Sequence, residues 1–201
     1  MNTTPRVIFG RQTACRRPKV YLAGPDVFFE DCSALAEEKK KICAEYGLEG
    51  IFPLDAALDL SACKSPQEKG IAISAANEAL IRECDALIAN LTPFRGVSAD
   101  VGTVYELGFA TALGKRVFAY TTETIPYSER VESAFGPIDR TTDRDRNAHL
   151  VELFELHDNL MLDGSLTTRG RPLVVNPGAR QGFVACVERL VEDLRLNPLQ
   201  A

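Results

Sequence analysis

The chain has 201 residues, a length that suits one α/β domain or one domain with a modest insertion. Hydrophobic residues make up 45% of the chain and charged residues 25%, proportions that exclude a disordered protein. The formal net charge of −5 excludes the general electrostatic footprint of a nucleic-acid-binding protein. No apolar run approaches the ~18 residues of a membrane-spanning helix. The six cysteines form no C-x-x-C pair, so we expect free thiols and a cytoplasmic location.

Short apolar runs alternate with segments of helical periodicity, after a polar, basic extension over residues 1–18. Strands are predicted over residues 19–24, 50–54, 85–91, 115–121 and 173–176. Helices are predicted over residues 29–46, 67–84, 100–113 and 180–196. This alternation predicts a parallel, doubly wound α/β sheet of about five strands with flanking helices and right-handed crossovers.

Residues 123–158 break this rhythm and are rich in charge. We expect an insertion here, with a helix near residues 147–157. The remainder of residues 19–201 is expected to form a single domain around it.

Ligands bind open α/β sheets at the carboxyl ends of the strands. The most unusual segment expected there is Asp100 to Gly108, which places two carboxylates, two glycines and a tyrosine at the start of a helix. Neither G-x-x-x-x-G-K-[ST] nor G-x-G-x-x-G occurs in the chain, so both common nucleotide-phosphate loops are absent.

Two interpretations are open for the acids of this segment. Glu106 could close a T-x-x-E capping box with Thr103, or it could be a nucleophilic carboxylate in a cleft. Asp100 could be an ordinary helix N-cap, or it could accept hydrogen bonds from a sugar hydroxyl. Gly102 and Gly108 would allow a ligand or a strand to approach the helix closely.

The segment after the first strand, Gly24 to Phe29, is expected at the same edge of the sheet. Asp26 could face a nucleobase or cap the following helix. Phe28 and Phe29 could stack on a base, although one of them is expected to pack in the core. Arg95, in the loop after the third strand, could bind phosphate or be solvated.

Three motifs in this order are similar to the nucleoside 2-deoxyribosyltransferase family. They are Tyr21-Leu-Ala-Gly-Pro25, Asp85-Ala-Leu-Ile-Ala-Asn90, and Asp100-Val-Gly-Thr-Val-Tyr-Glu-Leu-Gly-Phe-Ala110 with Ala112-Leu-Gly-Lys115. The stretch Ser74 to Tyr120, with Pro93-Phe94-Arg95-Gly96, is especially similar to protozoan-type members. The resemblance covers residues 19–121 and recurs weakly over residues 158–162. It implies a flavodoxin-like fold and exchange of bases on 2′-deoxynucleosides for nucleoside salvage.

The resemblance also assigns roles to residues. Glu106 matches the catalytic glutamate, which attacks the anomeric carbon and forms a covalent deoxyribosyl-enzyme with overall retention of configuration. Tyr21 matches the tyrosine that orients this glutamate, and Asp100 matches the aspartate that holds the sugar 5′-hydroxyl. Asn159 resembles an asparagine that a neighbouring subunit lends to the sugar site, which implies a homo-oligomer with shared active sites. Asn77, or alternatively Asp85, corresponds to the base-side aspartate.

The expected partners are therefore a 2′-deoxynucleoside and a free nucleobase, and no cofactor or metal is expected. The expected substrate contacts come from Asp100, Gly24, Asp26, Phe28, Asn77, Gly102 and Asn159. Two other functions stay open at this point: an N-glycoside hydrolase of deoxynucleosides or their 5′-monophosphates, and a non-catalytic nucleotide-sensing module. Asp100 would repel a phosphate, which favours an unphosphorylated nucleoside. A long final helix and residues 197–201 replace the short tail of some bacterial members, so base preference stays undetermined.

Overall fold

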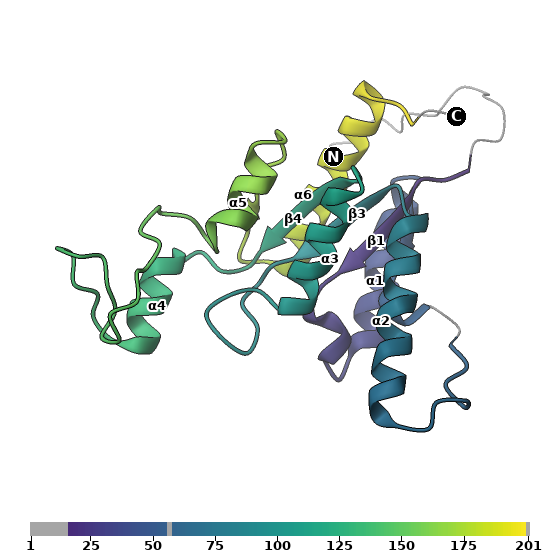
Figure 1. Cartoon of the computed structure of the whole chain (residues 1–201). Helices are drawn as coiled ribbons and strands as arrows, with labels where there is room; N and C mark the ends of the chain where they lie inside the picture. The colour runs from purple at the N-terminus through teal and green to yellow at the C-terminus, as the bar shows by residue number, and fades with distance from the viewer. Residues whose placement is uncertain (1–15, 56–57, 200–201) are drawn as a thin grey trace.

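The computed structural model describes residues 16–55 and 58–199, which form an α/β fold around one five-stranded sheet (Figure 1). The strands lie in the order β2-β1-β3-β4-β5, and all four neighbouring pairs are parallel. Their bounds are β1 Lys19–Ala23, β2 Glu49–Ile51, β3 Ala86–Asn90, β4 Arg116–Thr121 and β5 Val174–Val175. The predicted doubly wound parallel sheet of about five strands is confirmed.

The central strands have apolar side chains on both faces, because helices cover both faces of a parallel sheet. All five residues of β3 are buried, and Val20 and Tyr21 of β1 have no exposed surface. Tyr21 pairs in register with Leu87 on one side and with Ile51 on the other. The side chains of β1 alternate between two hydrophobic clusters, one on each face of the sheet.

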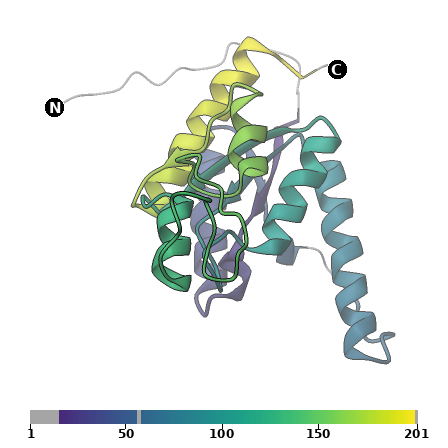
Figure 2. The same ribbon diagram turned by 60° about the vertical axis from the view of Figure 1, so that its left-hand side comes forward.

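The helices form two layers (Figures 1 and 2). Helices α1 (Cys32–Glu45) and α6 (Ala179–Leu196) pack on the face that carries Val20 and Leu22. Helices α2 (Pro66–Glu83), α3 (Val101–Ala112) and α5 (Leu160–Thr167) pack on the face that carries Tyr21 and Ala23. Within the described residues, no helix is both long and apolar enough to cross a membrane.

The strand order places a topological switch between β1 and β3. The chain leaves β1 for β2 at one edge, then returns to pair β3 on the other side of β1. The loops after β1 and β3 therefore diverge to opposite faces, and the gap between them is where doubly wound sheets bind ligands. A 3₁₀ helix, η1 (Pro25–Phe28), follows β1, and residues 91–100 follow β3. A second 3₁₀ helix, η2 (Pro53–Asp55), follows β2.

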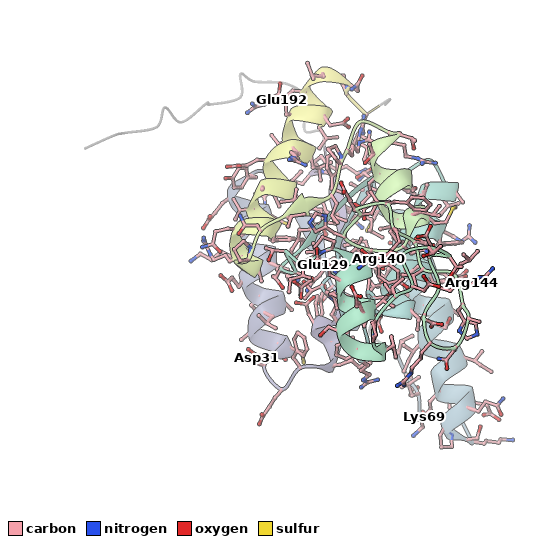
Figure 3. All side chains as sticks on the ribbon, turned by 90° about the vertical axis from the view of Figure 1, so that its left-hand side faces the viewer. Asp31, Lys69, Glu129, Arg140, Arg144 and Glu192 are labelled. Carbon is pink, nitrogen blue, oxygen red and sulfur yellow. The ribbon has the colours of Figure 1, made fainter. Side chains whose placement is uncertain are left out.

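The charged insertion differs from the sequence-based expectation. Its helix is α4 (Tyr127–Phe135), and no helix forms over residues 147–157, so that prediction was wrong. Residues 139–150 instead make isolated bridges, with Arg144 paired to both Asp139 and Leu150. Figure 1 shows this insertion projecting from the sheet, and Figure 3 marks Arg140 and Arg144 on it. Helix α5, which follows it, was not anticipated.

The N-terminal half of α2 also extends past the sheet (Figure 2). Ser65 caps this helix by accepting a hydrogen bond from the Glu68 amide at 3.1 Å, and Pro66 occupies its first turn. Figure 3 shows Lys69 at this protruding end. Of the predicted N-terminal extension, residues 1–15 lie outside the described residues.

Candidate active site

Glu106 and Tyr21 form the centre of the candidate site. The Tyr21 hydroxyl, on β1, donates a hydrogen bond to Glu106 Oε1 at 2.6 Å. Glu106 lies in the second turn of α3, past the positions of a capping box, so the capping interpretation of this residue is wrong. Tyr21 is fully buried, whereas Glu106 keeps part of its surface exposed. The hydrogen bond therefore fixes the carboxylate of a residue that stays partly exposed.

The environment of Glu106 keeps this carboxylate close to its titration point at neutral pH. Burial is the largest influence, and it raises the pKa of Glu106 from 4.5 to about 7. The Tyr21 hydroxyl acts in the opposite direction and lowers the pKa, whereas the nearby charge of Asp100 raises it further. Burial and the Glu106 carboxylate together raise the pKa of Tyr21, so its hydroxyl stays a hydrogen-bond donor. A perturbed acid of this kind is typical of an active site.

Asp100 caps the helix that carries Glu106. Its Oδ2 accepts hydrogen bonds from the Thr103 amide at 2.9 Å and from the Thr103 hydroxyl at 3.0 Å. The N-cap interpretation is therefore confirmed. The described residues donate no hydrogen bond to Asp100 Oδ1, so a sugar hydroxyl can still be accepted there. A Cβ at Gly102 would lie 3.1 Å from Asp100 Oδ2, which favours glycine at this exposed position.

Asp26 is already engaged within the protein. Its Oδ2 lies 3.0 Å from Lys39 Nζ of α1 and accepts a 3.4 Å hydrogen bond from Asn90 Nδ2. Both charged side chains of the pair are almost fully buried. Asp31, not Asp26, is the N-cap residue of α1, so the capping interpretation of Asp26 was wrong. A Cβ on Gly24 would come within 2.3 Å of Asp26 Oδ2, so this close approach requires glycine.

An exposed aromatic cluster lies where η1 meets the loop after β3. The rings of Phe28 and Phe94 stack with centroids 5.3 Å apart, and Phe29 meets Phe94 edge-on at 6.1 Å. The Arg95 guanidinium lies 4.9 Å from the Phe28 ring and 4.7 Å from the Phe94 ring. Phe28 and Phe29 are both exposed, so the expectation that one packs in the core was wrong, and Val27 packs there instead. The cluster offers flat surfaces of the kind on which a base stacks.

The structure separates the two candidates for the base-side residue. Asp85 lies at the amino end of β3, where it pairs with Arg16 at 2.7 Å and accepts from the Lys19 amide at 2.8 Å. Asp85 therefore lies at the amino ends of the strands, whereas the site lies toward their carboxyl ends. Asn77 lies one helical turn before Ile81, which is buried against the sheet beneath α2. Asn77 Oδ1 is buried without a hydrogen-bond partner, and an orphaned polar atom of this kind is a candidate for contact with a ligand.

Asn159 begins helix α5. Its Oδ1 accepts from the Met161 amide at 3.0 Å, and its Nδ2 donates to Glu152 Oε1 at 2.7 Å. The preceding residue, Asp158, accepts a 2.8 Å hydrogen bond from the Ala99 amide. The structure thus brings Asn159 near the loop that ends at Asp100 of the same chain.

Sequence reasoning gave no role to Lys39, Phe94 and Arg130, which contact residues around the site. For Lys39 a signal was present: it lies three residues from both Ala36 and Ile42, so it shares the buried face of α1. Phe94 and Arg130 lie in a loop and in the insertion, where no periodicity identifies a contact.

An accessible carboxylate with a raised pKa, held at the switch point of a parallel sheet, is suited to attack or stabilise a carbon at a glycosidic bond. A model of the family described as nucleoside 2-deoxyribosyltransferase matches residues 20–161. The match spans well over half of the chain, and the chain therefore belongs to the nucleoside 2-deoxyribosyltransferase family.

Comparison with individual proteins agrees with this assignment. An uncharacterized protein from Schizosaccharomyces pombe is 34% identical over 134 residues, which are 66% of this chain and 64% of the yeast protein. The chain thus spans slightly less than two thirds of that curated relative. The solved structure of a 2-desoxiribosyltransferase from Leishmania mexicana matches with a TM-score of 0.59 and 29% identity, over 85% of this chain and 97% of that one. A conserved protein from Enterococcus faecalis matches with a TM-score of 0.50 and 20% identity, over 87% and 99% of the two chains, and shows the fold alone.

Proposed function

We propose that this protein transfers the 2-deoxyribosyl group between nucleobases of 2′-deoxynucleosides through a covalent intermediate on Glu106. The observation that supports this most directly is the Tyr21–Glu106 hydrogen bond of 2.6 Å. It orients the carboxylate of a partly exposed residue, and a pKa of about 7 leaves about half of it ionised at neutral pH, in the form that can attack.

In the first step, an ionised Glu106 oxygen attacks the anomeric carbon of the bound nucleoside. The new C–O bond forms as the C–N bond to the base breaks, and the departing base keeps the electron pair and takes a proton from solvent. Positive charge develops on the sugar as this bond stretches, and the carboxylate stabilises that charge before trapping it. A 2-deoxy sugar forms the cation more readily, because no electron-withdrawing 2-hydroxyl opposes it.

In the second step, a nitrogen of an incoming base attacks the same carbon from the opposite side. Glu106 leaves with the electron pair of the C–O bond, and the base nitrogen loses a proton to solvent. Two inversions give retention of configuration. Attack by water instead of a base would give free deoxyribose, so exclusion of water decides between transfer and hydrolysis.

The other residues bind and orient the substrate in this proposal. Asp100 Oδ1 accepts a hydrogen bond from the sugar 5′-hydroxyl, and Phe28 contributes a flat wall for the base. Asn77 hydrogen-bonds the base once its side chain turns toward the ligand, because its amide oxygen is buried without a partner in the single chain. Asn77 is a neutral amide, so it can orient a base but cannot protonate it.

We also propose that the active unit is a homo-oligomer. Four large apolar side chains within nine residues of Asn159 in the sequence are exposed in the single chain: Leu150, Phe154, Leu160 and Met161. Several exposed large apolar residues in one short segment are consistent with a protein–protein interface. In such an assembly, Asn159 of one subunit completes the sugar site of its neighbour.

The transferase proposal is tested by product analysis. The protein is incubated with 2′-deoxyinosine or thymidine, with and without adenine, and the products are separated by chromatography. New 2′-deoxyadenosine with little free deoxyribose supports the transferase. Free base and deoxyribose, whether or not adenine is present, identify a hydrolase. No reaction with nucleosides, followed by cleavage of 5′-monophosphates, would refute the proposed substrate class.

Site sharing is tested by mixing two inactive variants, Glu106→Gln and Asn159→Ala. If Asn159 serves the neighbouring subunit, a randomly mixed dimer regains about a quarter of the wild-type activity, because half the dimers are mixed and each has one intact site. If Asn159 serves its own chain, every site keeps one defect and no activity returns. The second outcome is a specific alternative, because the hydrogen bond from the Ala99 amide to Asp158 holds the adjacent Asn159 near the site of its own chain.

A further inference from the structure

Arg130 of α4 joins three loops that are far apart in the sequence. Its Nε donates to the carbonyl oxygen of Val97 at 2.9 Å, its Nη1 to that of Ile125 at 2.5 Å, and its Nη2 to that of His157 at 2.6 Å. The side chain is only 8% exposed. A buried guanidinium whose three nitrogens each bind a different loop is a structural junction, because the planar fork fixes the relative directions of all three.

Asp158 extends this junction. One of its carboxylate oxygens, Oδ2, lies 3.9 Å from Arg130 Nη2 and accepts the 2.8 Å hydrogen bond from the Ala99 amide. The other, Oδ1, accepts from the Asn159 amide at 2.8 Å. Asp163 holds the same turn from the other side, since its Oδ2 accepts from the amide of Asp158 at 3.0 Å. Arg130 and Asp158 thus hold residues 97–99 and 157–159 against each other.

The junction lies directly beside the sugar side of the candidate site. Asp100 is the residue after Ala99, and its carboxylate caps the helix on which Glu106 lies. A displacement of residues 97–99 therefore strains the bonds by which Asp100 caps α3 and shifts its carboxylate, while the Tyr21–Glu106 hydrogen bond, made by β1, stays in place.

We propose that Arg130 is a positioning residue for the sugar side of the site, acting by fixing the loop that carries Asp100. This inference rests on the proposed function. It predicts that the insertion, which projects from the sheet, contributes to the reaction through Arg130 rather than through its exposed charges.

The test compares Arg130→Lys with a matched variant, Arg116→Lys. Lysine keeps the charge but has one nitrogen, so it cannot bind three divergent carbonyl groups. Arg116 is also largely buried, with 16% of its side chain exposed, and it binds Asp193 at 2.7 Å at the amino end of β4. Both variants lose a buried guanidinium, but only Arg130 lies at the site.

Kinetics are measured with a 2′-deoxynucleoside and with its 5′-deoxy analogue, which lacks the hydroxyl assigned to Asp100. We expect Arg130→Lys to lower kcat/KM at least about tenfold for the nucleoside, because small displacements of positioning groups are costly. The loss should be less than about threefold for the analogue, since Asp100 has no partner on it. Arg116→Lys should leave both values within about twofold of wild type. An equal loss on both substrates would overturn the proposal.

Hydrogen exchange provides a readout that does not require activity. Arg130→Lys should increase exchange at residues 97–100 and 157–163 while leaving residues 19–23 and 86–90 protected. Arg116→Lys should affect the end of α6 instead, where Asp193 lies. Unchanged exchange at residues 97–100 would refute the junction itself. If the wild-type protein neither transfers nor hydrolyses, the proposed function fails while the exchange result still decides the role of Arg130 in holding the loop.

Discussion

Replacing Glu106 with glutamine should stabilise the protein at alkaline pH and change its stability little at acid pH. The substitution keeps the shape and an oxygen that can accept the Tyr21 hydroxyl hydrogen bond, but it removes the ionisable group. Its effect on the free energy of unfolding therefore isolates what ionisation of Glu106 costs the folded state. A carboxylate kept for chemistry although it lowers stability is a common trade-off in enzymes.

The sign follows from the raised pKa. Between the ordinary pKa of 4.5 and the folded value of about 7, the folded protein holds a proton on Glu106 that the unfolded chain has released. The stabilisation from this proton is complete below pH 4.5 and is lost as the pH rises through about 7. Wild type should therefore lose stability relative to Glu106→Gln over this window.

The magnitude can be worked from the same shift. One pKa unit corresponds to about 1.4 kcal/mol, so the full shift corresponds to about 3 kcal/mol. Because Glu106 is partly exposed, screening by solvent reduces this value, and we expect about 2 kcal/mol near pH 8. Urea unfolding is monitored by far-ultraviolet circular dichroism at about pH 5 and about pH 8. If the slope of the free energy against urea concentration is unchanged, the shift of the midpoint gives the difference in the free energy of unfolding.

The matched control is Glu49→Gln, on the exposed surface of β2, which should show the same small effect at both pH values. The reasoning is refuted if Glu106→Gln has the same effect at both pH values, or if wild type is the more stable protein at alkaline pH. Either result would mean that burial does not raise the pKa of Glu106.

Three further substitutions test the surroundings of Glu106. For wild type we expect the acid limb of the kcat/KM–pH profile near pH 7, and Tyr21→Phe should move this limb to higher pH. The reason is that the Tyr21 hydroxyl, which the variant lacks, lowers the pKa of Glu106. An unmoved limb would contradict this. Tyr120→Phe, the matched change on β4, should leave that limb in place and stabilise the protein by up to about 1 kcal/mol in urea, since its buried hydroxyl has no hydrogen-bond partner. Lys39→Met should cost about 3 kcal/mol in the same assay by leaving Asp26 buried and unpaired, and adding Asp26→Asn should recover most of the loss; no recovery would place the cost elsewhere.

Much of the fold was predictable because buried parallel strands and amphipathic helices leave strong local patterns. The apolar run that ends at Leu91 and the periodic segment after Asp100 both appear close to their expected bounds. The insertion was not predictable in the same way. Its one helix is short, and Arg130, which holds it, satisfies backbone carbonyls that have no signature in the sequence.

The candidate site was also predictable only in part. Tyr21 and Glu106 were paired in advance through a family resemblance, and the structure confirms their contact. The capping interpretation of Asp26 was wrong because its carboxylate pairs with Lys39 of α1 instead. The pairing of Phe28 with Phe94 depends on two loops meeting in space, which local patterns do not encode.

The two interpretations of Asp100, as a structural cap and as a ligand-binding group, turn out to be compatible. The cap uses only Oδ2, which accepts both hydrogen bonds from Thr103. These bonds fix the rotation of the carboxylate, so the direction of the remaining oxygen, Oδ1, is set before any ligand arrives. A preorganised acceptor loses less side-chain entropy on binding than a free one. The capping bonds therefore support the proposed binding role of Asp100, because they aim its second oxygen and leave that oxygen free to accept a hydrogen bond.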